Sequence, residues 1–158
     1  MGTFNAKILA EFQPPRKWKL GRELSYSTTD LDSDDIAALQ NIGLDLKRDT
    51  NISPAVFTVP TEFMTDLAST PRALWAFVAP FDVARAAVVH DILYEKINTQ
   101  YKVVNESAAA EDGPATKRER EAYRKIADDV FLEGMHASEP PVPAWKKYAA
   151  YYAVRMFG

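Results

Sequence analysis

His90 and Asp91 are adjacent side chains whose types suit acid–base or metal chemistry, and they interrupt an apolar run. Histidine can act as a general base near neutral pH, and a carboxylate can bind a hard cation such as calcium. If the run is a helix, Tyr94 lies one turn beyond His90 on the same face. The pattern predicts a site built on this helix. The alternative is a buried polar network that only stabilises the fold.

Asp66, Ser69 and Arg72 form a second candidate group, in a polar stretch that follows an apolar strand pattern. Segments between a strand and a helix often carry functional residues. We therefore expect Asp66 to help bind a metal ion, with Ser69 and Arg72 close to the same site. The alternative is that Asp66 caps the following turn and pairs with Arg72.

Asp128 and Asp129 form the third candidate group, on a predicted helix whose apolar residues recur every three to four positions. Both aspartates lie about equally far from the centre of this apolar stripe, so periodicity does not distinguish them. Arg124 is four residues before Asp128 and can pair with it. A surface ion pair is the alternative interpretation for either aspartate.

Composition excludes several classes of site. The chain of 158 residues has two histidines and no cysteine, which excludes three-histidine zinc sites, thiolate metal sites and disulfides. The metalloprotease, P-loop and nucleophile-elbow motifs are also missing. The net charge of −3 gives no reason to expect nucleic-acid binding. No apolar run approaches the roughly 20 residues that cross a bilayer, so we expect no transmembrane segment.

The order of the predicted elements indicates an α+β fold, with a small N-terminal antiparallel β-sheet followed by a three- to four-helix bundle. We expect one domain over residues 1–158. Residues 1–64 are mainly β, with a short helical insertion at 28–52, and residues 70–158 are mainly α. Strands are predicted near residues 7–12, 18–20, 23–27 and 56–60.

Capping and turn residues predict where the helices begin and end. In the insertion, Ser33 is the expected N-cap and Gly43 the expected end of a short helix. Asp82 is expected to cap a helix that runs to about Lys96. A loop over residues 97–115, a helix over 116–135 and a last helix from about Ala144 complete the prediction.

Several short strings resemble one family. They are Val59-Pro60, Phe63, Thr65-Asp66, Ala68-Ser69, Pro71-Arg72, His90-Asp91, Leu93-Tyr94, Ala127-Asp128, Phe131, Met135, Val154-Arg155 and Phe157-Gly158. Together they resemble the domain-of-unknown-function family 1353, which occurs in phages and prophages. The resemblance covers about residues 5–158 and implies a bacteriophage origin.

A second resemblance concerns the mechanism. His90, Asp91 and Tyr94 are similar to the H-D-x-x-Y motif of the phospholipase A2 active-site helix. It implies that His90 activates water, that Asp91 binds Ca²⁺ and that Asp128, on a second antiparallel helix, orients His90. The phospholipase family also uses a glycine-rich calcium loop, but this chain has no glycine between Gly43 and Gly113. Asp66 and Ser69 would have to replace that loop.

Two hypotheses from different classes follow. The first is a bacteriophage-encoded hydrolase that acts on the host envelope, with His90 bonded to Asp128 at the floor of an open cleft and with Tyr94 beside them. The second is a non-catalytic virion component of the tail, neck or baseplate, or a phage accessory binding protein. Aromatic residues anchor interfaces; the last helix supplies Trp145, Tyr148, Tyr151, Tyr152 and Phe157. The expected location is the host cytoplasm before assembly or lysis, or the virion.

Overall fold

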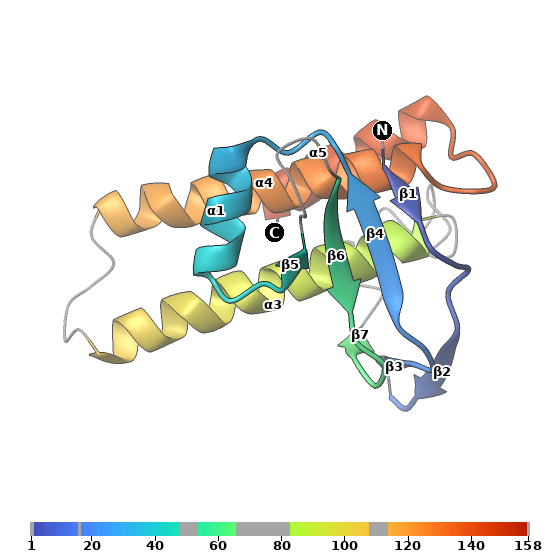
Figure 1. Ribbon diagram of the computed structural model, residues 1–158, viewed down its shortest axis with the longest axis horizontal. Coiled ribbons are helices and arrows are strands. Elements are labelled where there is room, and N and C mark those ends of the chain that lie inside the picture. Colours follow the sequence, from blue (N-terminus) through green and yellow to red (C-terminus); the bar gives the residue numbers. More distant parts are fainter. Residues whose placement is uncertain (1, 16, 48–53, 66–82, 108–113, 158) are drawn as a thin grey trace.

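The computed structural model describes residues 2–15, 17–47, 54–65, 83–107 and 114–157. Short strands and one short helix make up the N-terminal half, and long helices make up the C-terminal half (Figure 1). The strands are β1 (Thr3–Phe4), β2 (Ala10–Gln13), β3 (Lys17–Leu20), β4 (Leu24–Thr28), β5 (Leu46–Lys47), β6 (Ala55–Val59) and β7 (Met64–Thr65). The helices are α1 (Ser33–Asn41), α3 (Ala84–Ser107), α4 (Pro114–His136) and α5 (Ala144–Phe157). The predicted α+β class is confirmed.

The strands form two antiparallel sheets. One has the order β1-β4-β6-β5 and the other the order β2-β3-β7. Strand β4 alternates between buried and partly exposed side chains, and so does its neighbour β6, with Tyr26 opposite Phe57. This alternation of period two covers one face of the sheet with apolar side chains. The predicted strand over residues 23–27 is therefore present as β4, and it pairs with β1 and β6.

Helix α1 begins one residue earlier than its predicted cap implies. Asp32 is the N-cap, and its carboxylate accepts hydrogen bonds from the backbone amides of Asp34 and Asp35 at 2.9 and 2.8 Å. Ser33, the predicted cap, is the first helical residue. An aspartate in this position also benefits from the helix dipole. Gly43 follows the helix with φ of +80°, as predicted for a helix-ending glycine.

The prediction of a loop over residues 97–115 is wrong for the residues that α3 contains. The helix continues through Ser107, and its apolar face continues with Ile97 and Tyr101, which are 0% and 5% exposed. The ring of Tyr101 lies 6.3 Å from that of Tyr123 on α4. Thr99, Gln100 and Lys102, polar residues that indicated a loop, are exposed on this helix, and packing of the buried residues against α4 stabilises the helix.

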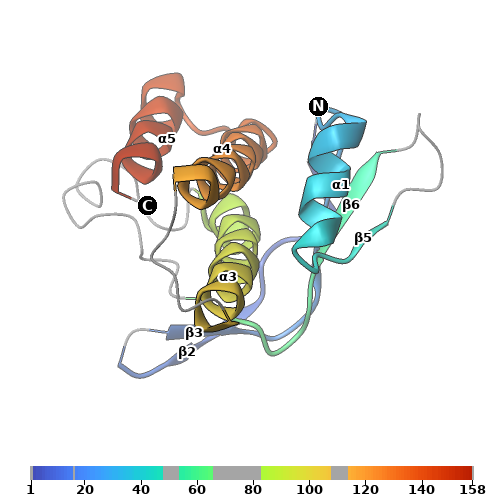
Figure 2. The ribbon, with the colours of Figure 1, turned by 90° about the vertical axis from the view of Figure 1, so that its left-hand side faces the viewer.

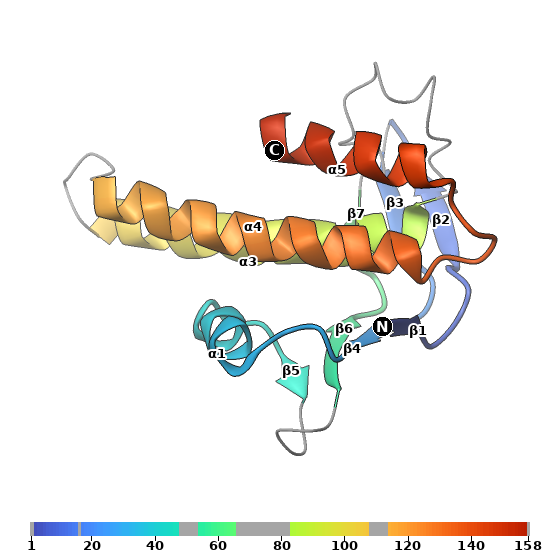
Figure 3. The same ribbon diagram turned by 90° about the horizontal axis from the view of Figure 1, so that it is seen from above.

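Helices α3 and α4 run antiparallel and pack along most of their length (Figures 1 and 3). The predicted apolar stripe of α4 faces the core, with Ala127, Val130 and Phe131 buried. Near the end of α4, a Cβ atom on Gly134 would lie 3.0 Å from the Cβ of Ala86. This separation is tighter than an ordinary contact, so a glycine here lets the two helices approach closely.

Helix α5 and the four-stranded sheet lie on opposite sides of the α3–α4 pair (Figures 2 and 3). Small residues, Ala150 and Ala153, form the buried side of α5. A stripe of Trp145, Tyr148, Tyr152 and Met156 on this helix is exposed to solvent. The stripe therefore packs no core, in contrast to the equivalent apolar face of α4.

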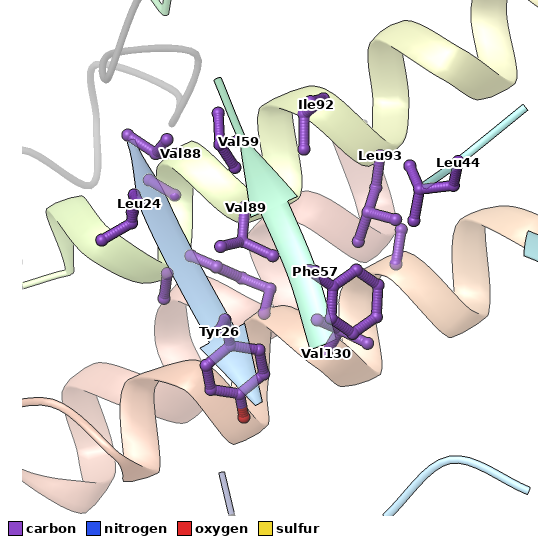
Figure 4. Packing of buried hydrophobic residues seen from close by; sticks show 14 of the residues in the cluster. Leu24, Tyr26, Leu44, Phe57, Val59, Val88, Val89, Ile92, Leu93 and Val130 are labelled. Atoms are coloured by element: carbon purple, nitrogen blue, oxygen red, sulfur yellow. The ribbon is translucent and has the colours of Figure 1, made fainter. Parts of the chain in front are cut away.

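The hydrophobic core lies between the four-stranded sheet and the helix pair. Figure 4 shows Tyr26 and Phe57 of the sheet close to Val89 and Leu93 of α3 and Val130 of α4. All five side chains are at most 2% exposed. Helices α3 and α4, which carry the candidate site residues, both pack against this core. Apolar packing therefore sets their relative position. Among the described residues, no helix is long and apolar enough to cross a membrane, as predicted.

The continued helix α3 leads to a first prediction. Ile97→Ala should lower the free energy of unfolding by about 2–5 kcal/mol, because it leaves a cavity in a closely packed core. Glu95→Ala, two residues earlier on the exposed face, is the control and should change stability by less than about 0.5 kcal/mol. Urea unfolding measures both values. Equal effects of the two variants would mean that residue 97 lies in a solvated loop.

Candidate functional site

Helix α3 presents the histidine and the tyrosine of the candidate site on one face. His90 is 8% exposed. The ring centroids of His90 and Tyr94 are 4.2 Å apart, as expected for residues four positions apart on a helix. The ring of Phe131 on α4 lies 5.1 Å from the imidazole. These aromatic contacts hold the imidazole plane in a fixed orientation between the two helices.

Helix α4 contributes Asp128, whose side chain is completely buried. Its Oδ1 atom lies 2.8 Å from His90 Nε2 and accepts a hydrogen bond of 3.0 Å from the hydroxyl of Tyr94. A carboxylate that faces a ring nitrogen requires a proton on that nitrogen. The contact therefore places a proton on Nε2 of His90, so that in the neutral imidazole the lone pair is on Nδ1.

Helix α5 closes the network from the other side. Arg155 donates a hydrogen bond of 3.0 Å to Oδ2 of Asp128 and one of 2.8 Å to Glu121 on α4. Its hydrogen bond to Asp128 raises the pKa of the guanidinium above its usual value. Asp128 thus has a cationic partner and receives hydrogen bonds from two other helices, which is the condition under which a buried carboxylate is tolerated.

The environment also affects Tyr94. Burial raises the pKa of its hydroxyl above the usual value, and the negative charge of Asp128 raises it further. Tyr94 therefore stays protonated at physiological pH and acts as a hydrogen-bond donor. The guanidinium carbon of Arg124 lies 5.6 Å from the centre of the Tyr94 ring. This cation–π contact takes the place of the Arg124–Asp128 ion pair that the sequence suggests.

Asp129 is the surface residue of the aspartate pair. It forms an ion pair of 2.6 Å with Lys125, four residues earlier, and accepts a 2.8 Å hydrogen bond from the Tyr151 hydroxyl. The side chains of Lys125 and Asp129 are 61% and 43% exposed. The surface-pair interpretation therefore holds for Asp129. It is wrong for Asp128, because Asp128 turns toward α3 and α5.

Asp91 points to a different part of the molecule from His90. Its Oδ2 atom accepts a hydrogen bond from the Thr65 hydroxyl at the end of β7. Adjacent helix residues point about 100° apart, so His90 faces α4 while Asp91 faces the three-stranded sheet that contains β7. The structure therefore brings His90, Tyr94 and Asp128 together and places Asp91 beside them. Asp66, Ser69 and Arg72 lie outside the described residues. The predicted cleft, which includes Asp66, therefore stays a prediction.

The predicted calcium site can be compared with the ligands that calcium needs, which are six to eight oxygens. The described residues offer Asp91 and Thr65 at this position, and nowhere do they form a cluster of three metal-binding side chains. On their own, they do not fit a calcium site. Calcium binding stays a prediction that depends on Asp66 together with Asp91.

Two partners of the aspartates were not predicted: Arg155, which binds Asp128, and Thr65, which binds Asp91. Both occur in the strings that carry the family resemblance, which is the one signal that points to them. Their contacts span 27 and 26 residues along the chain, so no local pattern reveals them. The second histidine, His136, lies elsewhere, at a pocket of about 260 Å³ that it shares with Asp30, Asp129 and Glu133.

The comparison with protein families assigns the chain. A family model described as "Protein of unknown function (DUF1353)" matches residues 42–154, which is most of the chain. The protein belongs to this family, as its motifs indicated. The matched range contains His90, Tyr94, Asp91 and Asp128. No curated protein and no solved structure matches the chain.

The buried carboxylate leads to a second prediction. Asp128→Ala should lower the free energy of unfolding by about 3–5 kcal/mol, because it leaves the donors of His90, Tyr94 and Arg155 without their acceptor. Asp129→Ala is the matched control, at the next position on the same helix, and should cost about 1 kcal/mol or less. Urea unfolding measures both values. If the two losses are equal, the network around Asp128 does not stabilise the helix packing.

Proposed function

We propose that this protein is a bacteriophage-encoded hydrolase with a phospholipase A2-like His/Asp site, and that it acts on an ester in the host envelope. His90 is the general base, Asp128 is its orienting partner and Tyr94 holds Asp128. The phage origin rests on the resemblance described above. The chemistry rests on the geometry of the histidine.

One observation carries the proposal: the 2.8 Å contact between His90 Nε2 and Asp128 Oδ1. It joins two antiparallel helices, as the resemblance to phospholipase A2 implies for its histidine and aspartate. Tyr94, at the tyrosine position of the H-D-x-x-Y motif, donates to the same oxygen. A histidine whose one nitrogen is fixed by a carboxylate has the other available as a base, which is the arrangement used in general-base catalysis.

The proposed reaction is hydrolysis of an ester by water. His90 Nδ1 removes a proton from a water molecule, and the water oxygen forms a bond to the ester carbonyl carbon. The tetrahedral intermediate then breaks its bond to the alcohol oxygen. The imidazolium returns the proton to this leaving oxygen, so the products are a carboxylic acid and an alcohol and His90 is neutral again.

The network around Asp128 supports the charged state of this cycle. When His90 takes up a proton, the buried carboxylate 2.8 Å away stabilises the positive charge more than it could in water. Arg155 binds the other oxygen of Asp128 and Tyr94 shares the first, so the carboxylate cannot rotate away from the imidazole. Asp128, Tyr94 and Arg155 are in this way positioning residues.

A virion component remains the second candidate, and a specific observation favours it. His90 and Asp128 are 8% and 0% exposed, and their network ties three helices together. A buried polar network of this kind can serve structure alone. In that case the protein binds other virion proteins of the tail, neck or baseplate, or serves as an accessory binding protein, and it hydrolyses nothing.

Hydrolysis of phospholipid vesicles is the third prediction and the direct test. The purified protein, with calcium present, should release fatty acid from phospholipid vesicles. His90→Gln should lower the rate about 10²–10⁴-fold, because glutamine can still donate to Asp128 but cannot act as the base. His136→Gln is the control and should keep the wild-type rate, since His136 lies outside the network.

Two outcomes would contradict the hydrolase. One is a folded wild type that releases no fatty acid from any vesicle tested, which would favour the virion component. The other is a His90→Gln variant that keeps the wild-type rate. Circular dichroism of each variant separates loss of activity from loss of folding.

Calcium binding by Asp91 and Asp66 is the fourth prediction. Calcium should raise the midpoint of thermal unfolding of the wild type, because a ligand that binds only the folded state stabilises it. Asp91→Asn should lose this increase while staying folded. Glu95→Gln, one turn further along the same helix, should keep it. A wild type that does not respond to calcium would mean that Asp91 serves structure through Thr65.

A further inference from the structure

The outer side of α5 carries a row of large, exposed side chains. We call it the α5 face; it consists of Trp145, Tyr148, Tyr152 and Met156, which are 57%, 46%, 58% and 69% exposed. The spacing of these residues places them along one side of the helix. The core residues are at most 9% exposed, so these four side chains do not belong to the core. An exposed apolar row of this kind marks a site of interaction.

The residue types of the α5 face match one environment in particular. Tryptophan and tyrosine combine an apolar ring with one polar group, and they concentrate at the boundary between lipid headgroups and acyl chains. A helix that lies in this boundary has aromatic residues on one side and lysine or arginine beside them. On α5, Lys146 follows Trp145 directly, with its Nζ atom 5.8 Å from the indole ring.

The charge of α5 favours an anionic partner. The helix contains Lys146, Lys147 and Arg155 and no aspartate or glutamate. Arg155 is paired with Asp128 and Glu121, so Lys146 and Lys147 supply the positive charge beside the face, although the whole chain has a net charge of −3. Lys147 is held by a 2.9 Å contact to Nδ1 of His136. A second copy of the same face would bring like charges together and be repelled, whereas an anionic lipid surface would attract them.

The α5 face is also connected to the candidate site. Tyr148, Tyr152 and Arg155 are spaced i, i+4 and i+7, so they lie along one side of the helix. Arg155 reaches Asp128, and Tyr151 binds Asp129. These bonds fix α5 to α4, so the face keeps a constant position relative to His90.

We propose that the α5 face binds the surface of an anionic phospholipid membrane, with Trp145, Tyr148, Tyr152 and Met156 inserted at the headgroup boundary. Binding to the membrane does not require that the protein be an enzyme. If the protein is the proposed hydrolase, binding through this face makes an anionic phospholipid in a bilayer its substrate class. This second statement rests on the proposed function.

Vesicle binding by the full chain tests the proposal and is the fifth prediction. The assay uses the His90→Gln background, so that no lipid is hydrolysed, with vesicles of phosphatidylglycerol and phosphatidylcholine or of phosphatidylcholine alone. The protein should bind the anionic vesicles more tightly, and added salt should weaken this binding because it screens the lysines. Trp145→Ser combined with Tyr152→Ser should raise the vesicle Kd about tenfold or more, since two buried aromatic rings are lost.

Phe12→Ser is the matched control, because Phe12 is a comparably exposed aromatic residue, 49% exposed, on β2. It should leave vesicle binding unchanged. Circular dichroism and the unfolding midpoint check that the double variant is folded, and α5 keeps Ala150, Ala153 and Arg155 in place.

Three results would overturn the proposal. The first is a folded protein that does not bind anionic vesicles. The second is a double variant that binds as tightly as its parent. The third is a dimer in sedimentation velocity that the double variant abolishes, together with no vesicle binding, which would make the α5 face an interface between copies. Vesicle binding by a wild type that releases no fatty acid would remove the hydrolase and keep the membrane face.

Discussion

The buried carboxylate of Asp128 is the interaction on which the helical half of this protein depends. A charge without access to water is stable only if polar partners surround it, and here α3 provides two of them and α5 the third. Each partner fixes one relationship between helices. His90 and Tyr94 set the register of α3 against α4, and Arg155 sets the register of α5. The apolar core holds the elements together without specifying these registers as sharply, because apolar contacts have no direction.

The sequence indicated much of this arrangement and missed its centre. Periodicity located α4 and α5, and it identified the apolar residues that α4 buries. It could not separate Asp128 from Asp129, since both are equally far from the stripe. The choice depends on which side of α4 the other helices occupy, and that is a property of the tertiary structure. Only the two resemblances, to family 1353 through Ala127-Asp128 and to the phospholipase A2 active-site helix, pointed to Asp128 in advance.

The wrong predictions have related causes. The loop expected over residues 97–115 was inferred from polar composition, but its described parts are helical: residues 97–107 belong to α3, where Ile97 and Tyr101 are buried, and residues 114–115 begin α4. Ser33 and Asp32 are both good caps, and the backbone conformation at Asp32 decides between them. Arg155 was missed as a partner of Asp128 because ion pairs between distant segments leave no local signal. For the loop and for Arg155 the deciding contact is long-range, whereas the cap of α1 is decided by the local backbone conformation.

The absence of a side chain at Gly134 has a consequence for how this family can diverge. With its hydrogen atom facing the methyl group of Ala86, Gly134 acts as a spacer of minimum thickness between α3 and α4. The imidazole and carboxylate lie one to two turns along from this contact on the same two helices, so the thickness of the spacer also determines their separation. A methyl group added here would move two helix backbones apart by tenths of an ångström and lengthen a hydrogen bond that it never touches. Natural variants of this fold should therefore tolerate substitutions at exposed positions more readily than at Gly134.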